Sequence, residues 1–174
     1  GTNDIRLLVG DSTNSSWAVN ASSASNTIGK NSWYHIALTR IGTTVKLYVN
    51  GLLAISSSSA PTSFTNTNYP IGLGWNNGSD PFYWNGYISD VRIIKGTALY
   101  TSNFVPQFTS PLTAVANTTL LTLQTNGAHN NSTFVDQSLF TSNTVITRSG
   151  NVTNGTFSPY GDNWSYYFDG SSGI

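Results

Sequence analysis

Hydrophobic and polar residues alternate along most of the chain, in short runs bounded by Gly, Asn, Ser and Pro. Alternation with a period of two is the pattern of a half-buried strand, whereas an amphipathic helix has apolar residues three and four positions apart. The pattern predicts strands at residues 4–10, 16–21, 33–40, 45–49, 52–55, 69–75, 87–94, 120–125, 144–148 and 164–169. We therefore expect an all-β fold.

The strongest local signal is Asn50-Gly51, which lies between the apolar runs KLYV and LLAI. A type I′ turn needs positive φ at both central residues, and Asn-Gly is the dipeptide that tolerates this best. The turn predicts a two-residue hairpin whose register places apolar side chains on both faces. The expected opposite pairs are Val49 with Leu52, Tyr48 with Leu53, and Leu47 with Ala54.

A second informative stretch is GYISDVRIIKGTALY at residues 86–100. It predicts one strand that ends at the turn residues Lys95-Gly96. One face of this strand would enter a core, while the other would keep Asp90 and Arg92 in water.

The composition is typical of a β-protein, and it argues against several classes of function. Charged residues are only 8% of the 174, the formal net charge is zero, and β-branched and aromatic residues outnumber good helix formers. The chain has no basic patch for nucleic acid, no long apolar run for membrane insertion and no Cys for a disulfide. It begins with Gly1 and contains no Met, so we expect a processed piece or a window on a longer chain.

The segments WYHIALTR, LYVNG and DVRIIKGTALY together resemble the laminin-G-like, concanavalin A-like jelly-roll domains, especially those found in tandem in phage tail fibres and other virion proteins. The resemblance implies an antiparallel β-sandwich. By this comparison residues 1–105 look like the later part of one sandwich, 106–117 a Pro-containing connector, and 118–174 the opening strands of a following repeat. Alternatively, 118–174 supplies the completing strands of a permuted or strand-exchanged sandwich.

Catalysis is not expected. Some relatives of this fold hydrolyse glycans with a pair of Glu residues, but this chain contains no Glu and its seven Asp are scattered. Of the two histidines, His35 lies within a predicted strand and His129 in an Asn-rich loop. No nucleophile elbow, phosphate loop or zinc motif occurs, so we interpret the protein as non-enzymatic.

The resemblance also suggests a structural Ca²⁺ ion, because Asp90 and Asp169 match acids that hold calcium in some relatives. The competing interpretation is structural: Asp90 would pair with Arg92, and Asp169 would form an Asx-turn with Gly170. Apart from this ion, no cofactor is expected.

A carbohydrate-binding site is predicted around one turn, where aromatic rings that stack on sugars lie near Asn and Asp side chains that bond to hydroxyls. Three consecutive aromatics cannot all point inward from a strand, so at least one of residues 82–84 should face outward or into an interface. The alternative is that these rings cap the core or pack against a neighbouring subunit. The candidate residues are Trp75, Asn77, Asp80, Tyr83 and Trp84, together with Phe82.

The function that the sequence favours is a structural and adhesive module of an extracellular fibre or virion appendage, which binds a cell-surface glycan or a protein. Such a module would act as a homo-oligomer or as one of several tandem repeats. The alternative is a carbohydrate-binding module attached to a hydrolase on a longer chain.

Overall fold

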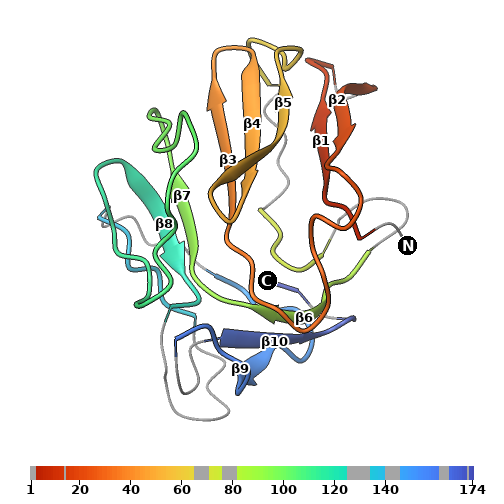
Figure 1. Cartoon of the computed structure of the whole chain (residues 1–174). Coiled ribbons are helices and arrows are strands. Elements are labelled where there is room, and N and C mark those ends of the chain that lie inside the picture. The colour runs from red at the N-terminus through yellow and green to blue at the C-terminus, as the bar shows by residue number, and fades with distance from the viewer. Residues whose placement is uncertain are drawn as a thin grey trace. The chain divides into compact units, whose positions relative to one another are not determined.

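The structure, a computed structural model, describes residues 3–13, 15–64, 71–75, 82–124, 134–139, 146–160, 165–171 and 173–174. Its regular elements are strands joined by loops (Figure 1). They are β1 (Arg6–Gly10), β2 (Trp17–Ser22), β3 (Ile36–Ile41), β4 (Thr44–Val49), β5 (Leu52–Ser57), β6 (Asn85–Ile88), β7 (Val91–Ile94), β8 (Thr118–Thr122), β9 (Thr153–Gly155) and β10 (Ser165–Asp169). Within the described ranges no helix is long and apolar enough to cross a membrane.

The chain divides into two compact units. The first unit consists of residues 1–68 and 98–106, and the second of residues 69–97 and 107–174. Each unit therefore draws on two separate stretches of sequence, and the short stretch 98–106 returns to the first unit after the chain has entered the second.

The first unit contains an antiparallel sheet of order β3-β4-β5 and the antiparallel hairpin β1-β2. One face of the sheet packs its apolar side chains with those of the hairpin. This core consists of Leu7, Val19, Val45, Leu47, Val49, Ile55 and Ala60. The alternation seen in the sequence is thus the alternation between this core face and the opposite face of β4.

The opposite face of β4 is covered in part by the stretch 98–106. Tyr48 is fully buried, and its ring contacts that of Phe104 edge-on, with centroids 5.6 Å apart. Phe104 in turn stacks on Tyr100, with centroids 3.6 Å apart, and meets His35 edge-on at 5.4 Å. Aromatic contacts therefore hold this returning stretch on the sheet.

The predicted hairpin turn is confirmed. Asn50 and Gly51 both have positive φ, at 50° and 79°, and Val49 pairs with Leu52. Tyr48 also pairs with Leu53 as predicted. The third predicted pair is wrong, because a register shift between Leu47 and Tyr48 places Leu47 opposite Ile55 and leaves Ala54 in a bulge.

The second unit contains an antiparallel sheet of order β6-β10-β9 and the antiparallel pair β7-β8. Strands β6 and β7 precede the Pro-containing stretch at residues 106–117, and their partners β8 and β10 follow it. In Figure 1, β10 accordingly lies beside β6 although most of the second half of the chain separates them. The core of this unit consists of Leu123, Val152, Tyr166, Phe168 and Ile174.

The prediction of one continuous strand at residues 87–94 is wrong. Strand β6 ends at Ile88 and β7 begins at Val91, because Asp90 adopts a positive φ of 55° that no strand residue has. The Asp90 N–H donates to the Leu123 carbonyl at 2.9 Å, which stabilises the break between β6 and β7.

Two further strand predictions differ from the structure. Within the predicted strand 144–148, the described residues 146–148 form no strand, whereas the nearby β9 was not predicted. Within the predicted strand 69–75, the described residues 71–75 form only an isolated bridge, from Trp75 to Tyr83. The other residues of these two predicted strands, 69–70 and 144–145, lie outside the described residues.

Candidate binding surface on the second unit

Three consecutive aromatic residues of the second unit are exposed. Phe82 is 71% exposed, Tyr83 42% and Trp84 49%. The prediction that at least one of them faces outward is confirmed. We call these three residues and Trp75 the aromatic surface.

Main-chain hydrogen bonds fix the aromatic surface from both sides. The Trp84 N–H donates to the Gly74 carbonyl at 2.7 Å, and the Gly170 N–H donates to the Trp84 carbonyl at 3.0 Å. On the other side of residues 73–75, Leu73 and Ile174 exchange two backbone bonds, of 2.6 and 3.0 Å. The rings therefore project from backbone that is paired rather than from a free loop, so little ordering is needed before a ligand binds.

Two glycines bring backbone close to the indole ring of Trp75. A Cβ atom at Gly173 would lie 2.2 Å from Cδ1 of Trp75, and one at Gly72 would lie 2.7 Å from its Nε1. Any larger residue at either position would have to displace the indole. Trp75 is consequently held half-buried against glycine backbone, and its place depends on the absence of side chains there.

The aromatic surface borders an open depression of about 300 Å³, which is lined by Gly74, Trp75, Phe82, Tyr83, Trp84 and Ile88. None of these residues carries a charge at neutral pH. Such a surface can stack on the apolar face of a sugar ring or accept an apolar side chain, and its lining offers no carboxylate or imidazole for general acid–base chemistry. The arrangement is therefore a candidate for binding, and the identity of its ligand stays a prediction.

Of the predicted carbohydrate-binding residues, the structure brings Trp75, Tyr83 and Trp84 together around this depression. Asn77 and Asp80 lie outside the described residues, and their participation stays a prediction. Ile88 was not predicted as part of this site, because alternation only placed it within the strand expected at residues 87–94.

Asp90 is not kept in water as the alternation predicted. Its Oδ1 accepts from the Leu112 N–H at 2.8 Å, its Oδ2 accepts from Ser89 Oγ at 2.9 Å, and it also bonds to Tyr160. Burial raises the pKa of the Asp90 carboxyl above its ordinary value, although these bonds oppose the rise. Burial, with the Asp90 charge, likewise raises the pKa of Tyr160. Asp90 therefore joins three segments of the second unit.

Asp169, the other acid predicted to hold calcium, closes a turn. Its Oδ1 accepts from the N–H of Ser171 at 2.9 Å and from the Ser171 hydroxyl at 2.8 Å, while Gly170 has φ 81°. Among the described residues, no three acidic or histidine side chains form a group that could hold a metal. Protein donors occupy both oxygens of Asp90 and Oδ1 of Asp169, and a shared Ca²⁺ site at these acids stays a prediction.

Among the described residues, the turn at Asp169 is one of three that share the pattern Asp-x-Ser/Thr. Asp11 accepts from the Thr13 N–H at 3.0 Å, and Asp136 accepts from the Ser138 N–H at 2.9 Å. Asp136 also accepts from the Leu121 N–H of β8 at 3.0 Å. This spacing of Asp and a hydroxyl residue is visible in the sequence and predicts Asx turns. The role of these three acids is therefore to stabilise turns.

Asp11 makes the most extensive of these networks. Besides Thr13 it accepts from the Ser15 N–H at 3.0 Å and from Ser16 Oγ at 2.7 Å. The bond from Ser16, followed by those from Thr13 and Ser15, holds the pKa of the Asp11 carboxyl well below its ordinary value of 3.8. Although the chain has few charged residues, the Asp11 carboxylate is used to stabilise its own turn.

The chain matches the model of a known protein family. A laminin G-type family model, described as the concanavalin A-like lectin/glucanases superfamily, matches residues 1–101, which confirms the resemblance seen in the sequence. No curated protein and no solved structure matches the chain. Strands β1 to β7 lie within the matched residues, and β8 to β10 lie beyond them.

Proposed function

Because the chain belongs to the concanavalin A-like lectin/glucanases superfamily and has its all-β sandwich fold, we propose that it is a non-enzymatic binding module whose aromatic surface holds a glycan. We further propose that the module belongs to an extracellular fibre or virion appendage. The family supports a β-sandwich module, and the ligand is argued from the surface itself.

The observation that carries the proposal is the exposure of three adjacent aromatic rings beside one depression. Burying a large aromatic side chain is worth roughly 1.5–3 kcal/mol, so three exposed rings in a row forgo a substantial contribution to folding. Contiguous apolar groups on a surface usually mark a binding site. Aromatic faces suit the C–H face of a pyranose, which supports a glycan as the ligand.

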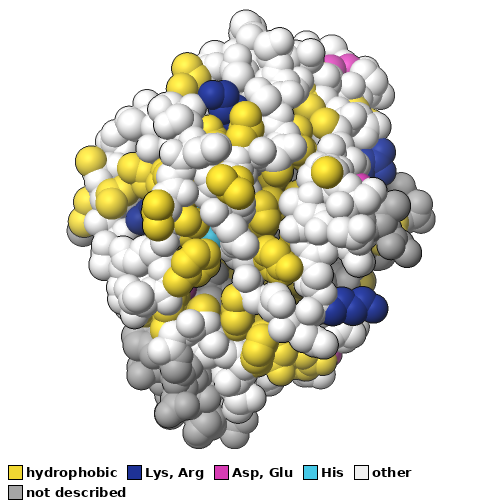
Figure 2. Space-filling view, in the orientation of Figure 1, with side chains coloured by type: hydrophobic (Ala, Val, Ile, Leu, Met, Phe, Trp, Pro, Cys, Tyr) yellow, Lys and Arg dark blue, Asp and Glu magenta, His cyan; other side chains and the backbone are white. Residues whose placement is uncertain are grey.

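The expected glycan is neutral. No residue that lines the depression is charged, and charged side chains are scarce in the whole chain. Figure 2 agrees for the face that it shows, where Lys and Arg side chains occur as isolated groups among hydrophobic and uncharged polar atoms. Affinity would therefore rest on ring stacking and hydroxyl hydrogen bonds, and it would depend little on salt.

The proposal is tested by measuring binding of the intact chain to neutral oligosaccharides on a glycan array, followed by calorimetry on the best ligand. In Trp84→Ala, loss of one stacking ring should weaken binding about tenfold, the equivalent of about 1.4 kcal/mol. Trp17→Ala is the matched control, because Trp17 is a comparably exposed tryptophan, 59%, in the first unit.

Three outcomes would contradict the proposal: no glycan bound by the folded chain, equal losses in the two variants, or glycan turnover. A protein partner captured through Trp84 in place of any glycan would instead make the aromatic surface a protein-docking site.

The appendage itself is tested on the native source. Mass spectrometry of the intact chain and electron microscopy of the assembly should find this module as one of several jelly-roll repeats in a fibre or particle. A parent chain that carries a hydrolase domain would favour a carbohydrate-binding module of an enzyme instead.

A further inference from the structure

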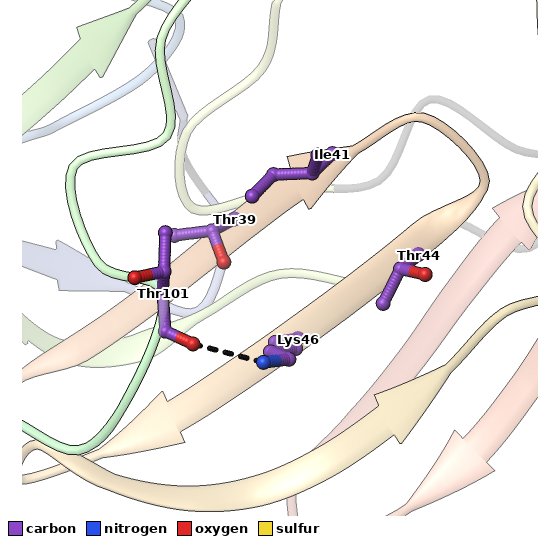
Figure 3. A pocket seen from close by; sticks show the side chains of 5 residues that line it. All are labelled: Thr39, Ile41, Thr44, Lys46 and Thr101. Atoms are coloured by element: carbon purple, nitrogen blue, oxygen red, sulfur yellow. Dashed lines mark hydrogen bonds between the residues drawn. The ribbon is translucent and has the colours of Figure 1, made fainter.

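A second concave site lies on the first unit, at the open part of the sheet face that residues 98–106 partly cover. It is a depression of about 230 Å³ lined by Thr39, Ile41, Thr44, Lys46 and Thr101 (Figure 3). We propose that this depression binds the carboxylate of an acidic monosaccharide unit, with Lys46 as the charged partner.

Strand pairing explains why these residues meet. Thr39 of β3 lies opposite Lys46 of β4, and Ile41 lies opposite Thr44. Directly paired residues of an antiparallel sheet project from the same face, so the four side chains form one cluster. Thr101, from the returning stretch, closes one side, as Figure 3 shows.

The Lys46 ammonium has more N–H donors than its hydrogen bond to Thr101 uses. Its Nζ donates to the Thr101 carbonyl at 2.8 Å, which also positions the ammonium at the depression. An ammonium group has three N–H donors, so two remain for a ligand. No carboxylate among the described residues pairs with Lys46, and none of the five lining residues is acidic. Within the part of the chain that the structure describes, no acid therefore compensates the positive charge of Lys46 at short range.

The remaining lining favours a sugar acid over a simple anion. The threonine hydroxyls can donate to and accept from sugar hydroxyls, and Ile41, which is 59% exposed, offers an apolar wall to ring C–H groups. The volume is below the roughly 300–1,000 Å³ of sites for drug-sized ligands, which suits a single sugar unit. Lys46, the single cation among the five lining residues, matches the single carboxylate of an acidic sugar unit.

The proposal is independent of the aromatic surface, which belongs to the other unit. It is tested by titrating the isotope-labelled full chain with methyl β-glucuronide and with methyl β-glucoside, its neutral counterpart, while backbone amide signals are followed by NMR. The glucuronide should shift signals of β3 and β4 and bind about tenfold more tightly than the glucoside, because a hydrogen bond between two charged groups is stronger than one to a neutral hydroxyl. Raising the salt concentration should reduce the difference.

Variants locate the site. Lys46→Gln should abolish the preference for the acid, whereas Lys30→Gln, which removes the same charge from an exposed lysine of the same unit, should leave it intact. Thr39→Val keeps side-chain size and the Lys46 contact with Thr101, and it should weaken glucuronide binding severalfold. This variant decides the matter even if Lys46→Gln fails to fold.

Further ligands separate the sources of the carboxylate. N-acetylneuraminic acid binding more tightly than the glucuronide would assign the site to sialic acids, and the reverse order would assign it to uronic acids. Acetate binding as tightly as either sugar would overturn the saccharide assignment. Equal binding of glucuronide and glucoside, or equal effects of the two lysine variants, would overturn the whole proposal.

Discussion

Replacing Gly51 by alanine tests how the returning stretch, residues 98–106, is held on the first unit. A Cβ atom at Gly51 would lie 1.9 Å from the Phe104 carbonyl oxygen, and the residue has a φ of 79°. Backbone therefore meets backbone at this point, and no side-chain rotation can relieve the collision. The change forces the segment around Phe104 away from the hairpin.

The magnitude follows from what that movement breaks. A left-handed conformation costs a non-glycine residue about 1–2 kcal/mol. The Phe104 N–H donates to the Gly51 carbonyl at 3.0 Å, and losing this bond costs about 0.5–1.5 kcal/mol. The ring contacts of Phe104 with Tyr48, Tyr100 and His35 contribute about 0.5–1.5 kcal/mol each where they are lost. We expect Gly51→Ala to lower the free energy of unfolding by about 3–5 kcal/mol.

Gly42→Ala is the matched control, because Gly42 also has a positive φ, 58°, but nothing lies within 4 Å of its would-be Cβ. This variant should lose only the conformational cost, about 1–2 kcal/mol. Urea unfolding followed by circular dichroism measures both. If the two variants lose the same stability within about 0.5 kcal/mol, the close approach at Gly51 contributes nothing and the reasoning is refuted.

Three other changes have defined outcomes. Because its hydrogen bonds lower the pKa of Asp11, their stabilisation is complete above the ordinary pKa of 3.8 and is lost as the pH falls; urea unfolding at pH 7 and pH 3 should show wild type losing its advantage over Asp11→Asn in acid, and a constant difference would contradict this. Gly173→Ala should displace Trp75, so the fluorescence of Trp75 and the affinity of the protein for its ligand should change together; unchanged emission would show that the indole has room. Since Asp90 and Asp169 already accept protein hydrogen bonds, Ca²⁺ and EDTA should give the same Tm, and a rise with Ca²⁺ would mean that the acids rearrange around the ion.

What could be predicted from the sequence was set by local chemistry. The Asn50-Gly51 turn was predictable because its conformation requires those two residues, and the apolar alternation of β4 followed from a one-sided core. The bulge at Ala54 was not predictable, because it depends on how β5 pairs with β4 beyond the turn and not on the turn residues. The break at Asp90 was missed for a similar reason, since its positive φ is supported by Leu123, more than thirty residues away.

The candidate site shows the same division. Exposure of at least one ring at residues 82–84 followed from strand geometry, but the placing of Trp75 depends on Gly173, which the sequence puts at the other end of the second unit. The depression at Lys46 was missed altogether. Cross-strand pairing and a contact from Thr101 assemble it, and no motif in the sequence joins those residues.

The pairing of β6 with β10 has a consequence for synthesis on the ribosome. The sheet β3-β4-β5 can form as soon as its hairpins emerge, since each strand pairs with its neighbour in sequence. Ile88 of β6, in contrast, waits for Tyr166, and at typical elongation rates that interval is about 4–16 s. During it, β6 has unpaired backbone edges while its partner does not yet exist. The region around β6 is therefore where a nascent chain would most need a chaperone, and where slowed translation would most favour pairing with another chain.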